Sequence, residues 1–223
     1  MTRIVVVYVV LVTIVIVCLI CVCVALVHKH KISKQRRIGA PLISVKPDVA
    51  VIWPNHIVMT YHKPVPQIVY DRLATFAPGV SYHVFTDEEC IDFLRNTCVP
   101  RVMKWYMTDG LNGAHKADLF RYVYLYIHGG IYLDIKTVLV KPISYVFPSR
   151  TDAYTVYTPH EKRGYNGIIV TPPGNPDMLV MVNFIINNVN PSCEYNIVIN
   201  EWGRVILSSS YRSEEHTSEL QSR

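Results

Sequence analysis

Cysteine is scarce outside the N-terminal part of this 223-residue chain, and no cysteines have the spacing of a zinc site. Three of the six cysteines lie within an apolar run over residues 4–27, where they serve as apolar filler or lipidation sites. Cys90, Cys98 and Cys193 remain, and this odd number allows at most one internal disulfide. The pattern excludes a cysteine-based zinc module and leaves the redox compartment open.

The chain also lacks internal repeats, long low-complexity tracts and a glycine-rich phosphate loop. Without such a loop, a nucleotidyltransferase is disfavoured. The net charge of +5 does not indicate a nucleic-acid partner, because much of it comes from basic residues directly behind the apolar run. We interpret this cluster as a solvated stop signal beside a membrane. It consists of Lys29, Lys31, Lys34, Arg36 and Arg37.

The apolar run over residues 4–27 is the longest in the sequence and follows a short tail of residues 1–3. A helix rises ~1.5 Å per residue and must cross ~30 Å of hydrocarbon, so this run predicts a transmembrane anchor. A cleaved signal peptide is the alternative, since Arg3 and the small residues around Ala25 fit a charged start and a cleavage site. Signal peptides have apolar cores of only ~7–15 residues, which favours the retained anchor.

Residues 28–49 predict a basic stem, with proline and glycine but no periodic pattern after the cluster. Positive charge on this flank of an anchor favours a cytoplasmic location for everything that follows it. Residues 50–211 have the composition of one folded domain. Residues 212–223 resemble the translation of a sequencing adapter, so we expect the natural chain to be interrupted near Tyr211 and the domain to be truncated.

Strand and helix patterns alternate through the first half of the domain. The apolar run at 57–61 predicts a buried strand, 82–85 predicts a second strand, and 67–77 predicts a helix with Ile68, Leu73 and Phe76 on its inner side. Thr86 followed by Glu89 predicts a capping box at the start of the next helix. This alternation is typical of an α/β fold around a mostly parallel sheet.

The most informative stretch begins with a helical pattern over 114–127. Its apolar face consists of Phe120, Val123, Tyr124 and Ile127. Asp118 and Arg121 lie on the opposite face, three residues apart and close enough to pair. The glycines that follow His128 predict the end of this helix, with a left-handed cap.

A strand is predicted over 131–140, with Asp134 and Lys136 on the same side of it. A carboxylate in such an apolar strand needs a cation or a hydrogen-bond donor as a partner. Ligands bind at the carboxyl ends of strands in open α/β sheets, so Asp134 is a candidate binding residue.

These residues match a known family. The segments 116–122 and 125–134, Lys-Ala-Asp-Leu-Phe-Arg-Tyr and Leu-Tyr-Ile-His-Gly-Gly-Ile-Tyr-Leu-Asp, resemble the Asp-X-Asp sugar transferases. That family includes yeast initiating mannosyltransferases and animal α1,4-galactosyltransferases. The segments 57–63 and 165–176 are similar to its opening strand and to a later strand and turn, so the resemblance covers about 54–190.

The resemblance implies an A-type glycosyltransferase fold, a single Rossmann-like α/β domain, and transfer with retention of configuration. Asp118, Arg121 and Asp134 would bind a GDP- or UDP-sugar, and Asp134 would be the first acid of the motif. We extend this donor site to three further residues, Tyr61, Lys136 and Asn166. Asp134 would also hold Mn²⁺ or Mg²⁺, which take oxygen ligands. The sequence assigns no catalytic residue.

The sequence departs from the family where Lys136 replaces the second acid. Three interpretations stay open. Lys136 replaces the metal by binding the diphosphate directly, the metal is held by Asp134 and a residue elsewhere, or Lys136 neutralises Asp134 in a non-catalytic relative. A Gly-Pro segment that the family has near its C-terminus is absent before Tyr211.

We therefore expect a hexosyltransferase of mannose or galactose type that acts on a glycan or glycolipid acceptor. The alternative is a membrane-tethered binding relative without turnover. The family resemblance implies a Golgi or endoplasmic reticulum protein with a lumenal domain, against the charge tendency of residues 28–49.

Overall fold

The computed structural model describes residues 42–48, 56–148, 153–158 and 163–208. They all belong to the second of two compact units, Ala40–Arg223. Within these described ranges no helix is long and apolar enough to span a bilayer. The predicted anchor over 4–27 and the adapter-like residues 212–223 lie outside them.

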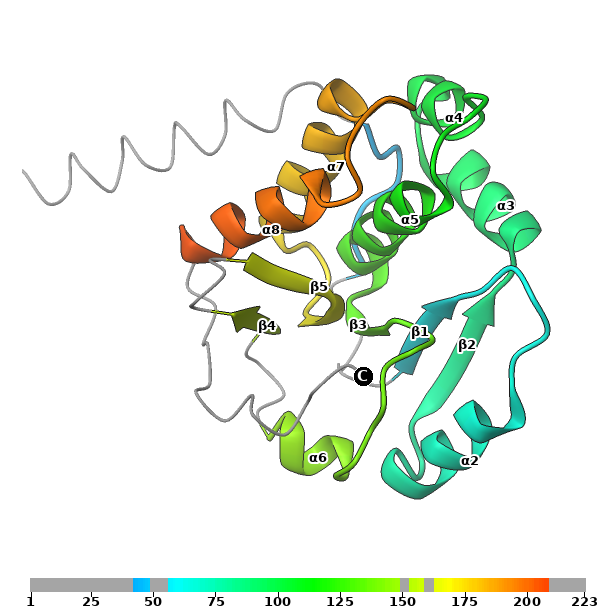
Figure 1. Ribbon diagram of the computed structural model, residues 1–223, viewed down its shortest axis with the longest axis vertical. Helices are drawn as coiled ribbons and strands as arrows, with labels where there is room; N and C mark the ends of the chain where they lie inside the picture. The colour runs from blue at the N-terminus through cyan, green and yellow to red at the C-terminus, as the bar shows by residue number, and fades with distance from the viewer. Residues whose placement is uncertain (1–41, 49–55, 149–152, 159–162, 209–223) are drawn as a thin grey trace, which may run out of the picture. The chain divides into compact units, whose positions relative to one another are not determined.

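A five-stranded sheet forms the centre of this unit, in the order β2-β1-β3-β5-β4 (Figure 1). Its strands are β1 (His56–Thr60), β2 (Ser81–Phe85), β3 (Gly130–Leu133), β4 (Tyr154–Thr158) and β5 (Arg163–Thr171). The first three run parallel, whereas β5 runs antiparallel to both of its neighbours. The predicted mostly parallel sheet is therefore a mixed one.

Helices cover both faces of the sheet. Figure 1 shows α2 and α6 on one face and the remaining helices on the other. The helices are α2 (Gln67–Phe76), α3 (Asp87–Thr97), α4 (Pro100–Tyr106), α5 (Gly113–His128), α6 (Ile143–Val146), α7 (Pro176–Asn188) and α8 (Ile197–Leu207). Because both faces are covered, the central strands β1 and β3 are apolar and buried at most of their positions, whereas the edge strand β2 is mostly exposed.

The local patterns of the first half are confirmed. The predicted strands at 57–61 and 82–85 and the helix at 67–77 correspond to β1, β2 and α2. Thr86 forms the predicted capping box with Glu89, whose backbone N–H donates to the Thr86 hydroxyl at 3.2 Å. Ile68 was expected on the inner side of α2 and is 51% exposed. Val69 packs against the core instead, because it is four residues before Leu73 on the same helical face.

The predicted helix over 114–127 corresponds to α5, but its burial differs from the expected one-sided pattern. Asp118 and Arg121 are as buried as Phe120 on the apolar face, because α5 lies between the sheet and α7. The helix ends at His128, and the capping residue Gly129 has a φ of 63° as glycine permits, but its ψ of -152° is not that of the predicted left-handed cap.

The predicted strand over 131–140 is wrong beyond Leu133, where β3 ends. The Asp134 N–H donates to the Gly167 carbonyl at 2.8 Å, and the Thr137 N–H donates to the Asp134 carbonyl at 2.8 Å. The second bond closes a turn. Asp134 and Lys136 therefore do not share one side of a strand.

The cysteines of the described residues form no disulfide. Cys90, Cys98 and Cys193 are free thiols, and the first two are buried. Burial raises the pKa of the Cys90 thiol to about 12 and that of Cys98 to about 11. Both are protonated at neutral pH and act as small apolar side chains.

Candidate functional site

The carboxyl edge of the sheet brings separate parts of the chain together. Tyr61 follows β1 and Asp134 follows β3, and both strands run parallel, so both residues lie at the same edge. β5 runs in the opposite direction, so its early residues 165–167 reach this edge from the other side. Asp134 is thus a neighbour of β5, which the sequence pattern alone did not place there, whereas Tyr61 lies one strand further away.

Asp134 is an accessible carboxylate at the end of β3, with 33% of its side chain exposed. One oxygen, Oδ1, lies 3.3 Å from Nη2 of Arg121. The other, Oδ2, accepts a hydrogen bond from the Tyr165 hydroxyl at 3.3 Å. These contacts fix the orientation of the carboxylate while leaving part of it open to solvent.

Arg121 is buried behind Asp134 and joins three groups. Its Nη2 lies 3.1 Å from Asp118 Oδ1, and its Nη1 donates to the Asn166 carbonyl at 2.5 Å. The guanidinium also lies 4.3 Å from the centre of the Tyr132 ring. Burial lowers the pKa of Arg121, but Tyr132, Asp134 and Asp118 raise it by more, so its pKa lies above the ordinary value. The guanidinium is a permanent positive charge inside the protein.

The Asn166 side chain is turned toward α5. Its amide nitrogen donates to Asp118 Oδ1 at 2.8 Å and to the Tyr122 hydroxyl at 3.2 Å. Both amide hydrogens are therefore used within the protein, and the residue is only 3% exposed. The predicted contact of Asn166 with a donor hydroxyl stays a prediction that this geometry does not support.

Gly167 allows β5 to approach Asp134 closely. A Cβ atom built on Gly167 would overlap with Asp134 Oδ2 and with the ring end of Tyr165. Every other residue at this position would displace the carboxylate or the tyrosine. The contact between Tyr165 and Asp134 was not predicted; the spacing of Tyr165 and Gly167, two apart on a strand, is the signal that places both on one face.

The Tyr165 hydroxyl keeps its proton over a wide pH range. Burial raises the pKa of Tyr165 to about 12, and the neighbouring Asp134 carboxylate raises it as well. At neutral pH the hydroxyl is thus a stable hydrogen-bond donor to Asp134.

Lys136 lies in the turn after Asp134 and is exposed. Among the described residues, the ion pair of Asp134 is made by Arg121, and none joins it to Lys136. The interpretation in which Lys136 neutralises Asp134 therefore has no support from the geometry.

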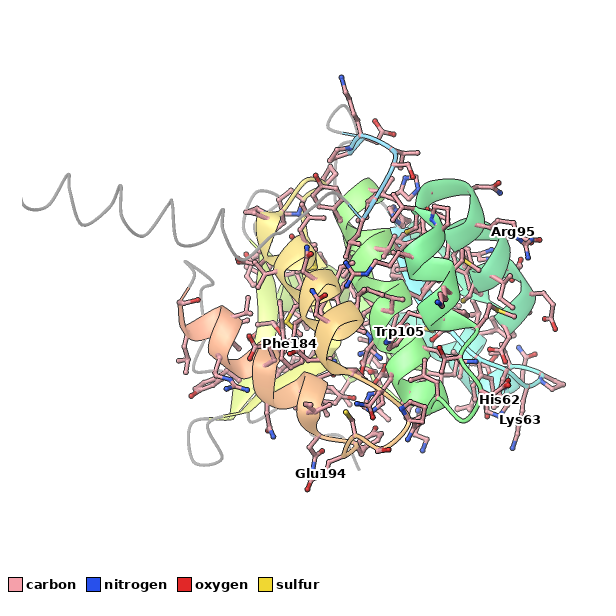
Figure 2. All side chains as sticks on the ribbon, turned by 90° about the horizontal axis from the view of Figure 1, so that it is seen from above. His62, Lys63, Arg95, Trp105, Phe184 and Glu194 are labelled. Atoms are coloured by element: carbon pink, nitrogen blue, oxygen red, sulfur yellow. The ribbon has the colours of Figure 1, made fainter. Side chains whose placement is uncertain are left out.

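A pocket of ≈ 600 Å³ opens beside this edge, between the carboxyl ends of β1 and β2. Tyr70 and Tyr82 line it with ring centres 5.9 Å apart. The loop after β1 contributes Tyr61, His62 and Lys63, and the last two project from the surface in Figure 2. The aromatic side chains suit a flat polar ligand, and the lining contains charges of both signs, Lys63 as well as Asp87 and Glu88.

The described residues contain no group of three His, Cys, Asp or Glu side chains close enough to share a metal ion. Asp118 also pairs with Arg121, but only 8% of its side chain is exposed. Its Oδ1 is already bound by Arg121 and by the Asn166 amide. The acid available for the predicted metal is thus Asp134.

Comparison with known proteins agrees with this arrangement. Residues 66–155 match the family described as "Glycosyltransferase sugar-binding region containing DXD motif". Asp118, Arg121, Asp134 and Lys136 lie within the match, whereas Tyr61 and Asn166 lie outside it.

Two curated relatives are similar to this chain. The initiation-specific α-1,6-mannosyltransferase of Saccharomyces cerevisiae is 30% identical over 131 residues, which cover 56% of this chain and 27% of that protein. The enzyme of the same name from Candida albicans is 31% identical over 102 residues, 45% of this chain and 25% of that protein. The chain spans about a quarter of the length of either relative.

The resemblance that the sequence indicated is therefore confirmed by comparison and agrees with the mixed α/β sheet. Residues 66–155 match the DXD-containing sugar-binding region of a glycosyltransferase family, and the relatives similar to this chain are glycosyltransferases by name.

Proposed function

We propose that this chain is a retaining hexosyltransferase, which moves a mannose- or galactose-type sugar from a GDP- or UDP-sugar to a glycan or glycolipid. The names of the relatives and the family match support the transfer of a sugar. The observation that carries the proposal is Asp134, a partly exposed carboxylate held in one orientation at the carboxyl edge of the sheet. Retention of configuration follows from the family resemblance.

In this proposal the donor lies across the carboxyl ends of β1 and β3. The open part of the Asp134 carboxylate accepts hydrogen bonds from sugar hydroxyls, and the aromatic pocket beside Tyr61 takes the nucleoside.

The leaving group is a nucleoside diphosphate, whose departure is favoured by positive charge nearby. Lys136 supplies such a charge. The buried Asp118 and Arg121 act through Asp134 by holding it in place. The A-type, Rossmann-like fold is supported by the five-stranded sheet with helices on both faces.

The predicted Mn²⁺ or Mg²⁺ ion needs several oxygen ligands, whereas no three His, Cys, Asp or Glu side chains of the described residues lie close enough to share an ion and Asp134 is already paired with Arg121. These residues do not fit the ion, so the proposed mechanism has no step through a metal.

The activity is tested by incubating the full chain with GDP-mannose or UDP-galactose and an acceptor glycan, and by measuring release of the nucleoside diphosphate. Asp134→Asn should lower the rate by about 100-fold or more, because it removes a charge aimed at the reacting sugar. Asp109→Asn, a change of the same chemistry at an exposed position, should leave the rate unchanged. Equal rates for both variants would contradict the assignment of Asp134.

A second function is favoured by one observation, Lys136 in the place of the second acid. A membrane-tethered module that binds nucleotide-sugars without turnover would retain the pocket and the edge. Saturable binding of donors with no nucleotide release from any of them, with or without an acceptor, would support the module.

We also propose that residues 4–27 anchor the protein as a single-pass membrane protein with its folded domain in the lumen of the Golgi or endoplasmic reticulum. The family resemblance supports the lumen, although the basic residues behind the anchor favour the opposite side. In sealed microsomes the domain should resist protease until detergent is added. Digestion without detergent would place the domain in the cytoplasm.

A further inference from the structure

We propose that the donor edge of this chain binds its diphosphate without a divalent metal, and that Lys136 supplies the positive charge in the place of the second acid. This inference rests on the proposed function, because it concerns the same nucleotide-sugar. It selects one of the interpretations that the sequence leaves open.

The first argument is the partner of Asp134 Oδ1. Nη2 of Arg121 lies 3.3 Å away, so a dication on this oxygen would lie against a fixed positive charge. Arg121 cannot swing aside easily, because Asp118 and the Asn166 carbonyl hold its guanidinium from the other sides. Only 5% of its side chain is exposed, so solvent would screen the repulsion poorly.

The second argument is the shortage of ligands. Asp134 Oδ2 already accepts the Tyr165 hydroxyl, and the nearest buried acid, Asp118, is occupied by Arg121 and Asn166. In the part of the chain that the structure describes, no three acid, histidine or cysteine side chains lie close enough to hold an ion together. Mg²⁺ and Mn²⁺ prefer octahedral sets of oxygen ligands, and this edge provides at most one or two of them.

The third argument is the position of Lys136. The bond from the Thr137 N–H to the Asp134 carbonyl closes a turn that contains Lys136, two residues after Asp134, and Lys136 is exposed there. No ion pair within the described ranges uses its ammonium group. A lysine in this state binds phosphate as a compact point charge, with hydrogen bonds strengthened by the charge.

The test is titration calorimetry of the full chain with GDP and UDP, in EDTA and in Mn²⁺. We expect the dissociation constants to agree within about twofold between the two conditions, because no metal takes part. Lys136→Ala should weaken binding by about tenfold or more in EDTA, as loss of a charge-assisted hydrogen bond does. Lys104→Ala, at an exposed position on α4, is the matched control and should bind as the unaltered chain does.

Lys136→Asp restores the Asp-X-Asp spacing and separates the alternatives further. We expect binding in EDTA to fall as in Lys136→Ala, and Mn²⁺ to restore little of it, because Arg121 still opposes the ion. Circular dichroism of each variant checks that the exposed substitution leaves the fold intact.

The results have separate meanings. Binding by the unaltered chain that requires Mn²⁺ overturns the inference and leaves the proposed function standing. Metal-free binding that Lys136→Ala does not weaken overturns the role of Lys136. Failure to bind either nucleotide under both conditions contradicts the proposed function itself.

Discussion

Nη2 of Arg121 lies 3.3 Å from Oδ1 of Asp134, and this ion pair joins the buried helix α5 to the exposed carboxyl edge of β3. The same nitrogen lies 3.1 Å from Asp118 Oδ1, so one guanidinium serves two carboxylates. The arrangement separates two tasks. Asp134 meets the solvent, while Asp118 and Arg121 hold it from behind.

Replacing Arg121 should destabilise the protein strongly. Arg121→Met leaves the buried Asp118 without its cation, and breaking a buried ion pair on one side costs about 3–5 kcal/mol. Chemical denaturation monitored by circular dichroism measures this cost. The matched control is Arg204→Met, which removes a pair with Glu201 that is 69% exposed on the arginine side and should cost at most ~1 kcal/mol. Similar midpoints for the two variants would show that the buried pair is not structural.

Substituting Gly167 should displace Asp134. The added methyl group of Gly167→Ala overlaps with the carboxylate and with Tyr165, and overpacking of this kind costs about 1–3 kcal/mol. Nucleotide binding should weaken along with stability. Gly113→Ala is the control, because no atom lies within 4 Å of the added Cβ, and its effect should stay within about 0.5 kcal/mol. Unchanged nucleotide affinity in Gly167→Ala would refute the close approach at Asp134.

Substituting Asn166 tests whether this residue positions Asp118 or contacts the nucleotide-sugar. Asn166→Ala removes the donor to the Asp118 carboxylate, which should cost about 1–3 kcal/mol of stability. Asn188→Ala removes an exposed bond to the Phe184 carbonyl and should change stability by no more than about 0.5 kcal/mol. If Asn166 instead bonds a sugar hydroxyl, its variant would lose donor affinity while the denaturation midpoint stayed constant.

Acid should destabilise the protein through two histidines. Burial lowers the pKa of His56, as does the nearby His128, while a backbone bond to Gly129 raises it. Burial also lowers the pKa of His128, and Asp48 opposes this. Both rings are favoured neutral in the folded state, so their contribution to stability is fully present above the unfolded pKa near 6.5. It is lost as pH falls through the lowered folded values, because the unfolded chain then binds more protons.

Melting temperatures between pH 7.5 and 5 test this sign. The midpoint should fall toward pH 5, and the double variant His56→Gln, His128→Gln should flatten the decline. His83→Gln keeps both of these rings and should retain the acid sensitivity. A double variant that declines as steeply as the unaltered chain would assign the effect to other groups.

Local features were predictable because neighbouring residues determine them. The capping box at Thr86 depends on two side chains three residues apart, and α5 follows from a 3.6-residue period that ends at Gly129. The wrong prediction for Ile68 is also a local one. Ile68 and Val69 both fit the apolar pattern of α2, and only packing against the core shows that Val69 lies on the inner side.

The sequence by itself determined the α/β class, since it depends on patterns along the chain, and its motifs indicated the resemblance to the sugar transferases and the candidate set Asp118, Arg121 and Asp134. Only the tertiary structure decided how they are connected. β5 returns antiparallel beside β3, and its Gly167 carbonyl accepts the Asp134 N–H, after which a turn closed by the Thr137 N–H follows. That return gives Asp134 the hydroxyl of Tyr165 as a partner, and α5 contributes the buried Arg121, while no ion pair among the described residues joins Asp134 to Lys136. Pairing between distant segments depends on which surfaces the fold buries together, and it cannot be predicted from the spacing of residues along the chain.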